Sequence, residues 1–427
     1  MLPRSRVSQF NVWLIPLLYA LGALLLGFTI PRLAYNLFPG FLSSISADAA
    51  IGIYSAVASG MLALTGIVFS LTFVMVQFSA TAYSPRLVLW VARDPVMSHA
   101  MGVFTATFLY ALVSLAWVDR HGSGRVPIIG ITIITTLLVV SIFMFVALIQ
   151  RVGMLQVNHM LVFTGDQGRE IIETIYPPIQ ARPSPGSAEI LQLPCCQTLS
   201  HHGKPRVLQA IDIPSLLEVA GRADCVVEVT AQVGDSVLDS TPILRVFGSN
   251  GAVAEAALRK PIQLGSERTF EQDPKYAIRL LVDIAIKALS PAVNDPTTAV
   301  QALDQIEDLL IRLGRRRLEI GAYHDGAGKL RLLVAFPAWD DFLRLAFDEI
   351  RIYGATSVQV MRRMSALLSE LLSIMPEERR PALRSWQERL RSTIERTFHD
   401  KQDVQDASDE DRQGLGSSRR ITSVKSH

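Results

Sequence analysis

The chain has 427 residues, of which 49% are hydrophobic and 19% are charged, and its mean hydropathy is +0.30. This composition is more apolar than that of an ordinary soluble enzyme and predicts a membrane protein. A formal net charge of +2 provides no strongly basic field, so no nucleic-acid partner is expected. Residues 1–150 carry seven Arg, three Asp and no Lys or Glu, which predicts a membrane half followed by a soluble half.

Four segments are long and apolar enough to cross about 30 Å of hydrocarbon, which takes roughly 20 helical residues. They cover about residues 11–31, 49–78, 98–118 and 126–150, within a predicted transmembrane domain over residues 1–151. An even number of spans puts both termini on one side of the bilayer. The arginines on that side are Arg4, Arg6, Arg86, Arg93, Arg151 and Arg169, against Arg32, Arg120 and Arg125 on the other. This excess predicts cytoplasmic N- and C-termini.

Small and polar residues recur along the second span at steps that place them on one helical stripe. The stripe consists of Gly52, Ser55, Ser59, Gly66, Ser70 and Gln77. One interpretation is close helix packing through small residues. The other is that the stripe from Ser55 to Gln77 lines a wetted pore in a homo-oligomer, with Gln77 near the cytoplasmic end. No Asp, Glu, Lys or Arg lies inside any span, which disfavours a proton-driven transporter.

The loop after the second span contains two further candidates, Ser84 and Arg86. Ser84 is able to cap a helix that starts at Pro85. One interpretation is an interfacial helix with Trp90 at headgroup depth and Arg86 facing lipid phosphate. The alternative makes Ser84 and Arg86 part of the cytoplasmic mouth of the pore.

The soluble half is predicted to be an α+β region in several parts. A helix and a linker cover 152–205, and three β-rich runs at 207–212, 225–231 and 243–247 predict a small β-domain over 206–250. A helical or α+β domain is expected over 267–375, with a β-hairpin formed by 315–323 and 329–336. A charged helix over 376–399 and a disordered tail over 400–427 complete the chain.

Residues 233–244 of the small β-domain resemble the hairpin of barrel-sandwich hybrid domains, which are related to biotinyl and lipoyl carriers. The matching segment reads Val-Gly-Asp-Ser-Val-Leu-Asp-Ser-Thr-Pro-Ile-Leu. No Lys occupies the hairpin tip where a carrier would bear its cofactor. This part is therefore predicted to be an assembly module without a swinging arm.

The segment 267–299 is the most distinctive part of the sequence. Asp295 is well placed to cap a helix that begins at Pro296. The alternative is a polar pocket at a helix N-terminus, where an anion or a metal could bind. Its members would be Arg268, Asp273, Arg279, Asn294, Asp295, Thr297 and Thr298. Two acids, Asp273 and Asp295, without a His are too few to predict a metal site.

Three motifs carry a resemblance to a known family. They are Tyr83-Ser84-Pro85-Arg86, then Arg268-Thr269-Phe270 with Asp273-Pro274, and Ala288-Leu289-Ser290-Pro291 followed by Asn294-Asp295-Pro296-Thr297-Thr298-Ala299. Together they resemble the bacterial predicted-membrane-protein family called domain of unknown function 2254, over most of residues 10–370. The resemblance implies a four-span envelope protein with a C-terminal cytoplasmic region, placed in the bacterial inner membrane. It implies no activity and no site residues.

No signature of a nucleotide-binding, metalloprotease or serine-hydrolase site is present, so the sequence does not predict an enzyme. The three cysteines have no zinc-site spacing, and no cofactor is expected. The leading hypothesis is an oligomeric channel or conduit for ions or small solutes, with a cytoplasmic vestibule or gate. The alternative is a non-conducting membrane-anchored sensor or scaffold, whose cytoplasmic part binds an ion, a small molecule or a partner.

Overall fold

The computed structural model describes residues 14–37, 42–82, 95–118, 125–153, 157–179, 193–249 and 251–416. The chain divides into two compact units near residue 159. We call residues 6–159 the membrane unit and residues 160–427 the C-terminal unit. Ser84 and Arg86 lie outside the described residues.

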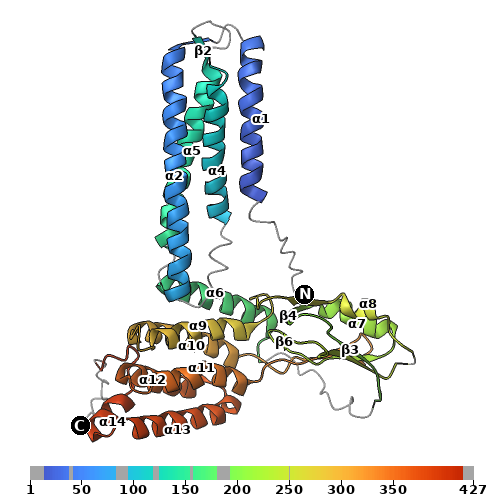
Figure 1. The fold of residues 1–427 in the computed structure, drawn as a ribbon. Helices are drawn as coiled ribbons and strands as arrows, with labels where there is room; N and C mark the ends of the chain where they lie inside the picture. The colour runs from blue at the N-terminus through green and yellow to red at the C-terminus, as the bar shows by residue number, and fades with distance from the viewer. Residues whose placement is uncertain are drawn as a thin grey trace, which may run out of the picture. The chain divides into compact units, whose positions relative to one another are not determined.

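The membrane unit is a bundle of long helices (Figure 1). They are α1 (Leu14–Leu37), α2 (Ala47–Ala82), α4 (Pro95–Leu115) and α5 (Ile128–Gly153). All four are long and apolar enough to cross a membrane, which confirms the number of candidate spans. Two short antiparallel strands, β1 (Leu42–Ser46) and β2 (Arg125–Pro127), pair the α1–α2 and α4–α5 connections at one end of the bundle.

Glycines allow α1 and α4 to approach closely. A Cβ added at Gly102 would lie 2.6 Å from the Tyr19 ring, and one at Gly27 would lie 3.0 Å from Val113. Helices α4 and α5 are joined by a buried hydrogen bond of 3.0 Å between the hydroxyls of Thr107 and Ser141. Small residues and hydroxyl pairs of this kind bring membrane helices together.

The outer surface of the bundle is apolar. Large side chains such as Leu25, Phe69 and Phe143 are more than 60% exposed. Water would make this exposure costly, whereas hydrocarbon solvates these side chains. The surface therefore fits the predicted embedding in lipid.

The β-region of the C-terminal unit has two sheets, and they do not form a closed barrel. The larger sheet contains β3 (Cys195–Ser200), β7 (Pro242–Phe247), β5 (Val226–Val229), β10 (Leu330–Val334) and β9 (Ala322–His324), in that order. The smaller sheet contains β6 (Ser236–Val237), β4 (Arg206–Ile211) and β8 (Ile262–Gly265). Two short helices, α7 (Ile213–Arg222) and α8 (Glu255–Arg259), connect the strands.

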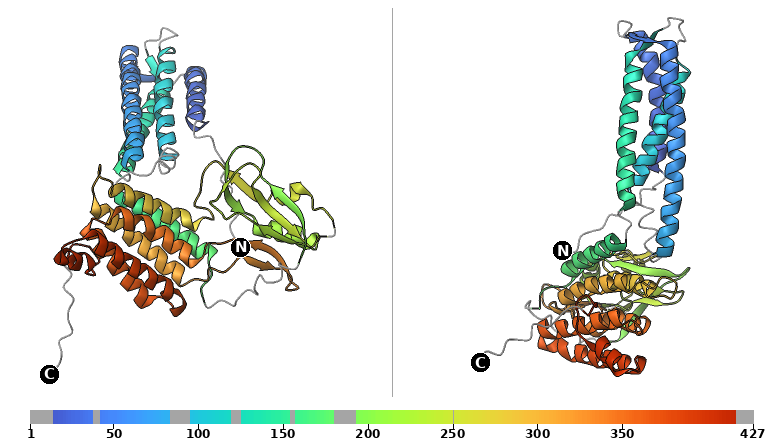
Figure 2. Two further views of the ribbon diagram at one scale, coloured as in Figure 1. Left: turned by 60° about the horizontal axis from the view of Figure 1, so that its bottom comes forward. Right: turned by 90° about the vertical axis from the view of Figure 1, so that its left-hand side faces the viewer.

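The helical region of the C-terminal unit stacks its helices in layers beside the β-region (Figure 2). Its helices are α6 (Val157–Ile175), α9 (Pro274–Ala288), α10 (Pro296–Gly314), α11 (Trp339–Tyr353), α12 (Val358–Ile374), α13 (Arg380–Thr397) and α14 (Lys401–Ser408), with a 3-10 turn at Glu377–Arg379. Helix α11 ends at Tyr353, and α12 begins at Val358.

The structure corrects one expectation about the β-region and leaves another untested. The predicted β-domain over 206–250 is too short, because β10 pairs parallel to β5 and brings the hairpin 322–334 into the same sheet. The two arms of the hairpin expected at 233–244, β6 and β7, lie in different sheets, so the likeness to a barrel-sandwich hybrid stays a prediction. The helix expected within 152–205 is present as α6, which begins at Val157.

The tail was expected to be disordered from residue 400, and this is wrong for residues 401–416. Helix α14 is capped by Asp400, whose carboxylate accepts hydrogen bonds from the amides of Gln402 and Asp403. Asp411 is buried and accepts a hydrogen bond of 2.5 Å from the Gly416 amide. These polar caps stabilise the segment where the sequence offers few apolar residues.

Candidate functional site

The stripe on α2 faces away from the other helices of the membrane unit. Its candidate pore residues, Ser55, Ser59, Gly66, Ser70 and Gln77, are all exposed. The opposite face of α2, which includes Ala50, Tyr54, Met61 and Val68, is buried in the bundle. A Cβ added at Gly52 or Gly66 would meet no atom within 4 Å. Within one chain the stripe therefore packs against no other described helix, and the pore role, which needs a homo-oligomer, stays a prediction.

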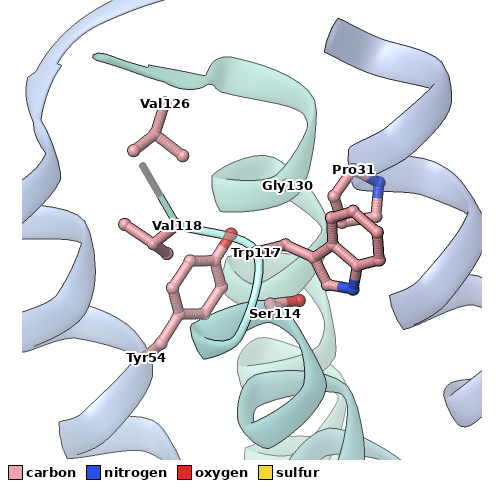
Figure 3. A pocket seen from close by; sticks show the side chains of 7 residues that line it. All are labelled: Pro31, Tyr54, Ser114, Trp117, Val118, Val126 and Gly130. Atoms are coloured by element: carbon pink, nitrogen blue, oxygen red, sulfur yellow. The ribbon is translucent and has the colours of Figure 1, made fainter. Parts of the chain in front are cut away.

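The described residues of the membrane unit form an apolar core inside the bundle. Tyr54, Phe104, Tyr110 and Ile134 are at most 2% exposed and belong to this core. Figure 3 shows a cavity at one end of the bundle, between Pro31, Tyr54, Ser114, Trp117, Val118, Val126 and Gly130. Its volume is about 20 Å³, which is room for a single water molecule.

In the C-terminal unit, the carboxylate of Asp273 forms the centre of a polar junction between the helical region and the β-region. Asp273 is 1% exposed and caps α9 by accepting a 3.1 Å hydrogen bond from the Tyr276 amide. Its other oxygen binds the Arg268 guanidinium, with Nε at 2.7 Å and Nη2 at 2.6 Å. The Arg268 guanidinium also lies over the Tyr276 ring, 5.3 Å from its centroid. We call this arrangement, together with Gly234, the Asp273 junction.

The β-region contributes a tight turn to the Asp273 junction. Gly234 has φ +93°, and a Cβ added there would lie 2.2 Å from Asp273 Oδ2. Beside it, Lys275 donates a 2.7 Å hydrogen bond to the Gln232 side chain. Gln272 exchanges two hydrogen bonds with the backbone of Ile211 in β4. The distinctive segment 267–273 therefore fastens the β-region to the start of α9.

Burial raises the pKa of the Asp273 carboxyl, against the opposing effect of Arg268. A carboxylate so enclosed is held by its neighbours and has little surface left for a ligand. The Asp273 junction is thus suited to fixing structure rather than to binding or catalysis.

The remaining members of the expected polar pocket lie elsewhere. Arg279 binds Asp283 on its own helix and both oxygens of Glu349 on α11, at 2.5 and 2.8 Å. This pairing lowers the pKa of Glu349. Arg279 therefore joins α9 to α11.

Asn294, Asp295, Thr297 and Thr298 lie at the opposite end of α9 from Asp273. The 15 residues of α9 span about 22 Å at 1.5 Å per residue. Asn294 has φ +47°, and Asp295 caps α10 by accepting hydrogen bonds from the amide and the hydroxyl of Thr298, at 3.1 and 2.6 Å. The structure thus places the seven residues in three separate groups, and the single pocket is not formed.

A buried ionic cluster between α10 and α12 was missed by the sequence analysis. The Arg363 guanidinium binds Asp304 at 2.9 Å and also binds Glu307. Burial raises the pKa of Glu307, although Arg363 opposes this effect. Asp304 and Glu307 are one turn apart on α10, but nothing local marks Arg363 as their partner.

Replacement of Gly234 by Ala tests the close approach at the Asp273 junction. The positive φ alone should cost on the order of 1–3 kcal/mol, and displacement of the Asp273–Arg268 pair should add to this loss. We expect Gly234→Ala to lower the thermal unfolding midpoint of the full chain in detergent. Gly221→Ala is the matched control, because its Cβ would meet nothing within 4 Å and Ala is the better helix former. Equal midpoints for the two variants would contradict the described contact.

Substitutions of Asp295 distinguish capping from charge pairing. As a cap, Asp295→Asn should be nearly neutral, whereas Asp295→Ala should cost about 0.5–2 kcal/mol in unfolding free energy. A buried charge pair would instead make Asp295→Asn cost about 3–5 kcal/mol. Thermal unfolding of both full-length variants measures the difference, and a large loss for Asp295→Asn would refute the capping role.

Comparison with known proteins identifies a family, but the matching proteins have no assigned activity. Residues 9–370 match the family described as predicted membrane protein (DUF2254). Uncharacterised proteins from Mycobacterium bovis and from two strains of Mycobacterium tuberculosis are 26% identical over 369 residues, covering 82% of this chain and 69% of theirs. No solved structure matches the chain. Because the family match spans most of its length, the chain belongs to this family of predicted membrane proteins.

Proposed function

We propose that the chain is a membrane-anchored sensor or scaffold, in which the four helices form a non-conducting anchor and the C-terminal unit binds a ligand or partner. The apolar core that the described residues form inside the bundle carries this proposal. Phe104 and Tyr110 are fully buried in this core, and the cavity between Pro31, Tyr54 and Gly130 has room for about one water molecule. A conduit within one chain would need a continuous space for a hydrated ion.

The proposed location is the bacterial inner membrane, with both termini in the cytoplasm. The number of candidate spans is even, and more arginines flank the side that carries the termini. This orientation exposes the C-terminal unit to cytoplasmic ions, metabolites and proteins.

An oligomeric channel is the second candidate, and one observation favours it. The α2 stripe from Ser55 to Gln77 faces outward, where it would contact another copy in a homo-oligomer. Such a ring would place the Ser59 and Ser70 hydroxyls along a central axis. The same outward face is compatible with lipid, because a serine hydroxyl is able to bond to a carbonyl of its own helix.

Ion flux through liposomes tests the anchor against the channel. We expect the purified protein in liposomes to give no conductance above that of empty liposomes in potassium, sodium or chloride gradients. Ser70→Leu and Gln77→Leu should then change nothing. A conductance that these substitutions abolish, and that Phe143→Leu on the outer face of α5 leaves intact, would contradict the anchor and support the channel.

A further inference from the structure

A surface pocket of about 290 Å³ lies between the end of α6 and the end of α10. It is lined by Glu173, Asp308, Ile311, Arg312, Arg315 and Arg316. Its volume is near the lower limit for small-molecule sites, so it suits a small ligand. A run of three arginines, as at 315–317, is usually an ordinary solvated surface. Here Arg315 and Arg316 line a pocket, which distinguishes this run from such a surface.

Backbone contacts hold the arginine-bearing segment in place. Arg316 pairs with Pro178 in a short antiparallel bridge, and the Arg315 carbonyl accepts a 3.3 Å hydrogen bond from the Ile179 amide. The Arg316 side chain donates to the carbonyls of Tyr176 and Glu173, at 2.5 and 3.3 Å. These carbonyls orient the guanidinium without cancelling its charge.

The acidic residues of the lining already have partners. Arg312 binds both oxygens of Asp308, at 3.1 and 3.3 Å, and also binds Glu173. Asp308 accepts a further 2.7 Å hydrogen bond from Arg169. The two carboxylates are therefore occupied by Arg312 and Arg169, and they leave the charges of Arg315 and Arg316 unmatched.

Arg315 supplies the donors that remain. Its side chain is exposed, and within the parts of the chain that the structure describes its guanidinium makes no hydrogen bond or ion pair. A cation would be repelled by the three guanidinium groups, and an apolar ligand would find only Ile311. A phosphate group, by contrast, accepts paired hydrogen bonds from guanidinium and carries the charge that the pocket lacks.

We propose that this pocket binds the phosphate group of a small phosphorylated molecule, with Arg315 as its main contact and Arg316 beside it. The proposal rests on the proposed function, because it names the ligand class of the C-terminal unit. The same chemistry could come from a soluble phosphate ester or from a phospholipid headgroup.

Pyrophosphate is the probe, and isothermal titration of the full chain in a neutral detergent is the measurement. We expect saturable binding that Arg315→Gln weakens at least about tenfold and that Arg315→Lys partly restores, since a charged hydrogen bond contributes this much. Arg384→Gln is the matched control, because Arg384 is also exposed and is without a partner among the described residues. It should bind as the wild type does.

Two results would overturn the proposal that this pocket binds phosphate. One is the absence of saturable pyrophosphate binding, and the other is equal weakening by Arg315→Gln and Arg384→Gln, which would indicate a general effect of charge. Neither result bears on the proposal of a non-conducting anchor, because the flux measurement tests that proposal separately. Conversely, flux through liposomes would refute the anchor whether or not pyrophosphate binds.

Nanodiscs distinguish the two sources of phosphate. Pyrophosphate titrations are compared in discs of phosphatidylcholine alone and in discs that also contain phosphatidic acid. If phosphatidic acid competes in the wild type and not in Arg315→Gln, the pocket takes a lipid headgroup. If it does not compete while pyrophosphate still binds, the pocket takes a soluble phosphorylated molecule.

Discussion

The C-terminal unit depends on the burial of one carboxylate, that of Asp273, between the Arg268 guanidinium and the backbone of Gly234. Removing a carboxylate from water is expensive unless hydrogen bonds and an opposite charge replace the solvent. Here the Tyr276 amide and Arg268 replace it. This site fixes the start of α9, the helix that carries Arg279 to Glu349 on α11.

The membrane unit follows a different constraint, because lipid provides no hydrophobic force that drives one helix against another. Helices in the membrane unit therefore need close packing or a polar contact to associate. Gly27 and Gly102 allow close packing between α1 and α4, and the buried hydroxyls of Thr107 and Ser141 join α4 to α5. Helix α2 turns its stripe away from these contacts. A buried apolar core and an apolar exterior are consistent with the proposed anchor, in which the C-terminal unit would bind the ligand or partner.

The sequence was informative where the signal is local. Apolar runs located the four spans, and Asp295 followed by Pro296 located the start of α10. Contacts between distant residues were not predictable, because no spacing rule links β10 to β5 or Arg363 to Glu307. The prediction of a single polar pocket was wrong for the same reason, because the whole length of α9 separates Asp273 from Asp295. Helix α7 was not predicted, because ten residues are too few for the sequence to distinguish a short amphipathic helix from a turn between strands.

Water accessibility of the α2 stripe tests the central claim most directly. The three native cysteines are replaced by serine, and Ser59→Cys or Ser70→Cys is introduced singly. Each variant is reconstituted in liposomes and treated with a charged, membrane-impermeant thiol reagent that is supplied on both sides of the membrane. Leu415→Cys, on the exposed surface of the C-terminal unit, is the positive control. The anchor account predicts labelling of the control and none at Ser59→Cys or Ser70→Cys, because lipid or packed protein surrounds them. Rapid labelling at both stripe positions would indicate a wetted path and contradict the account.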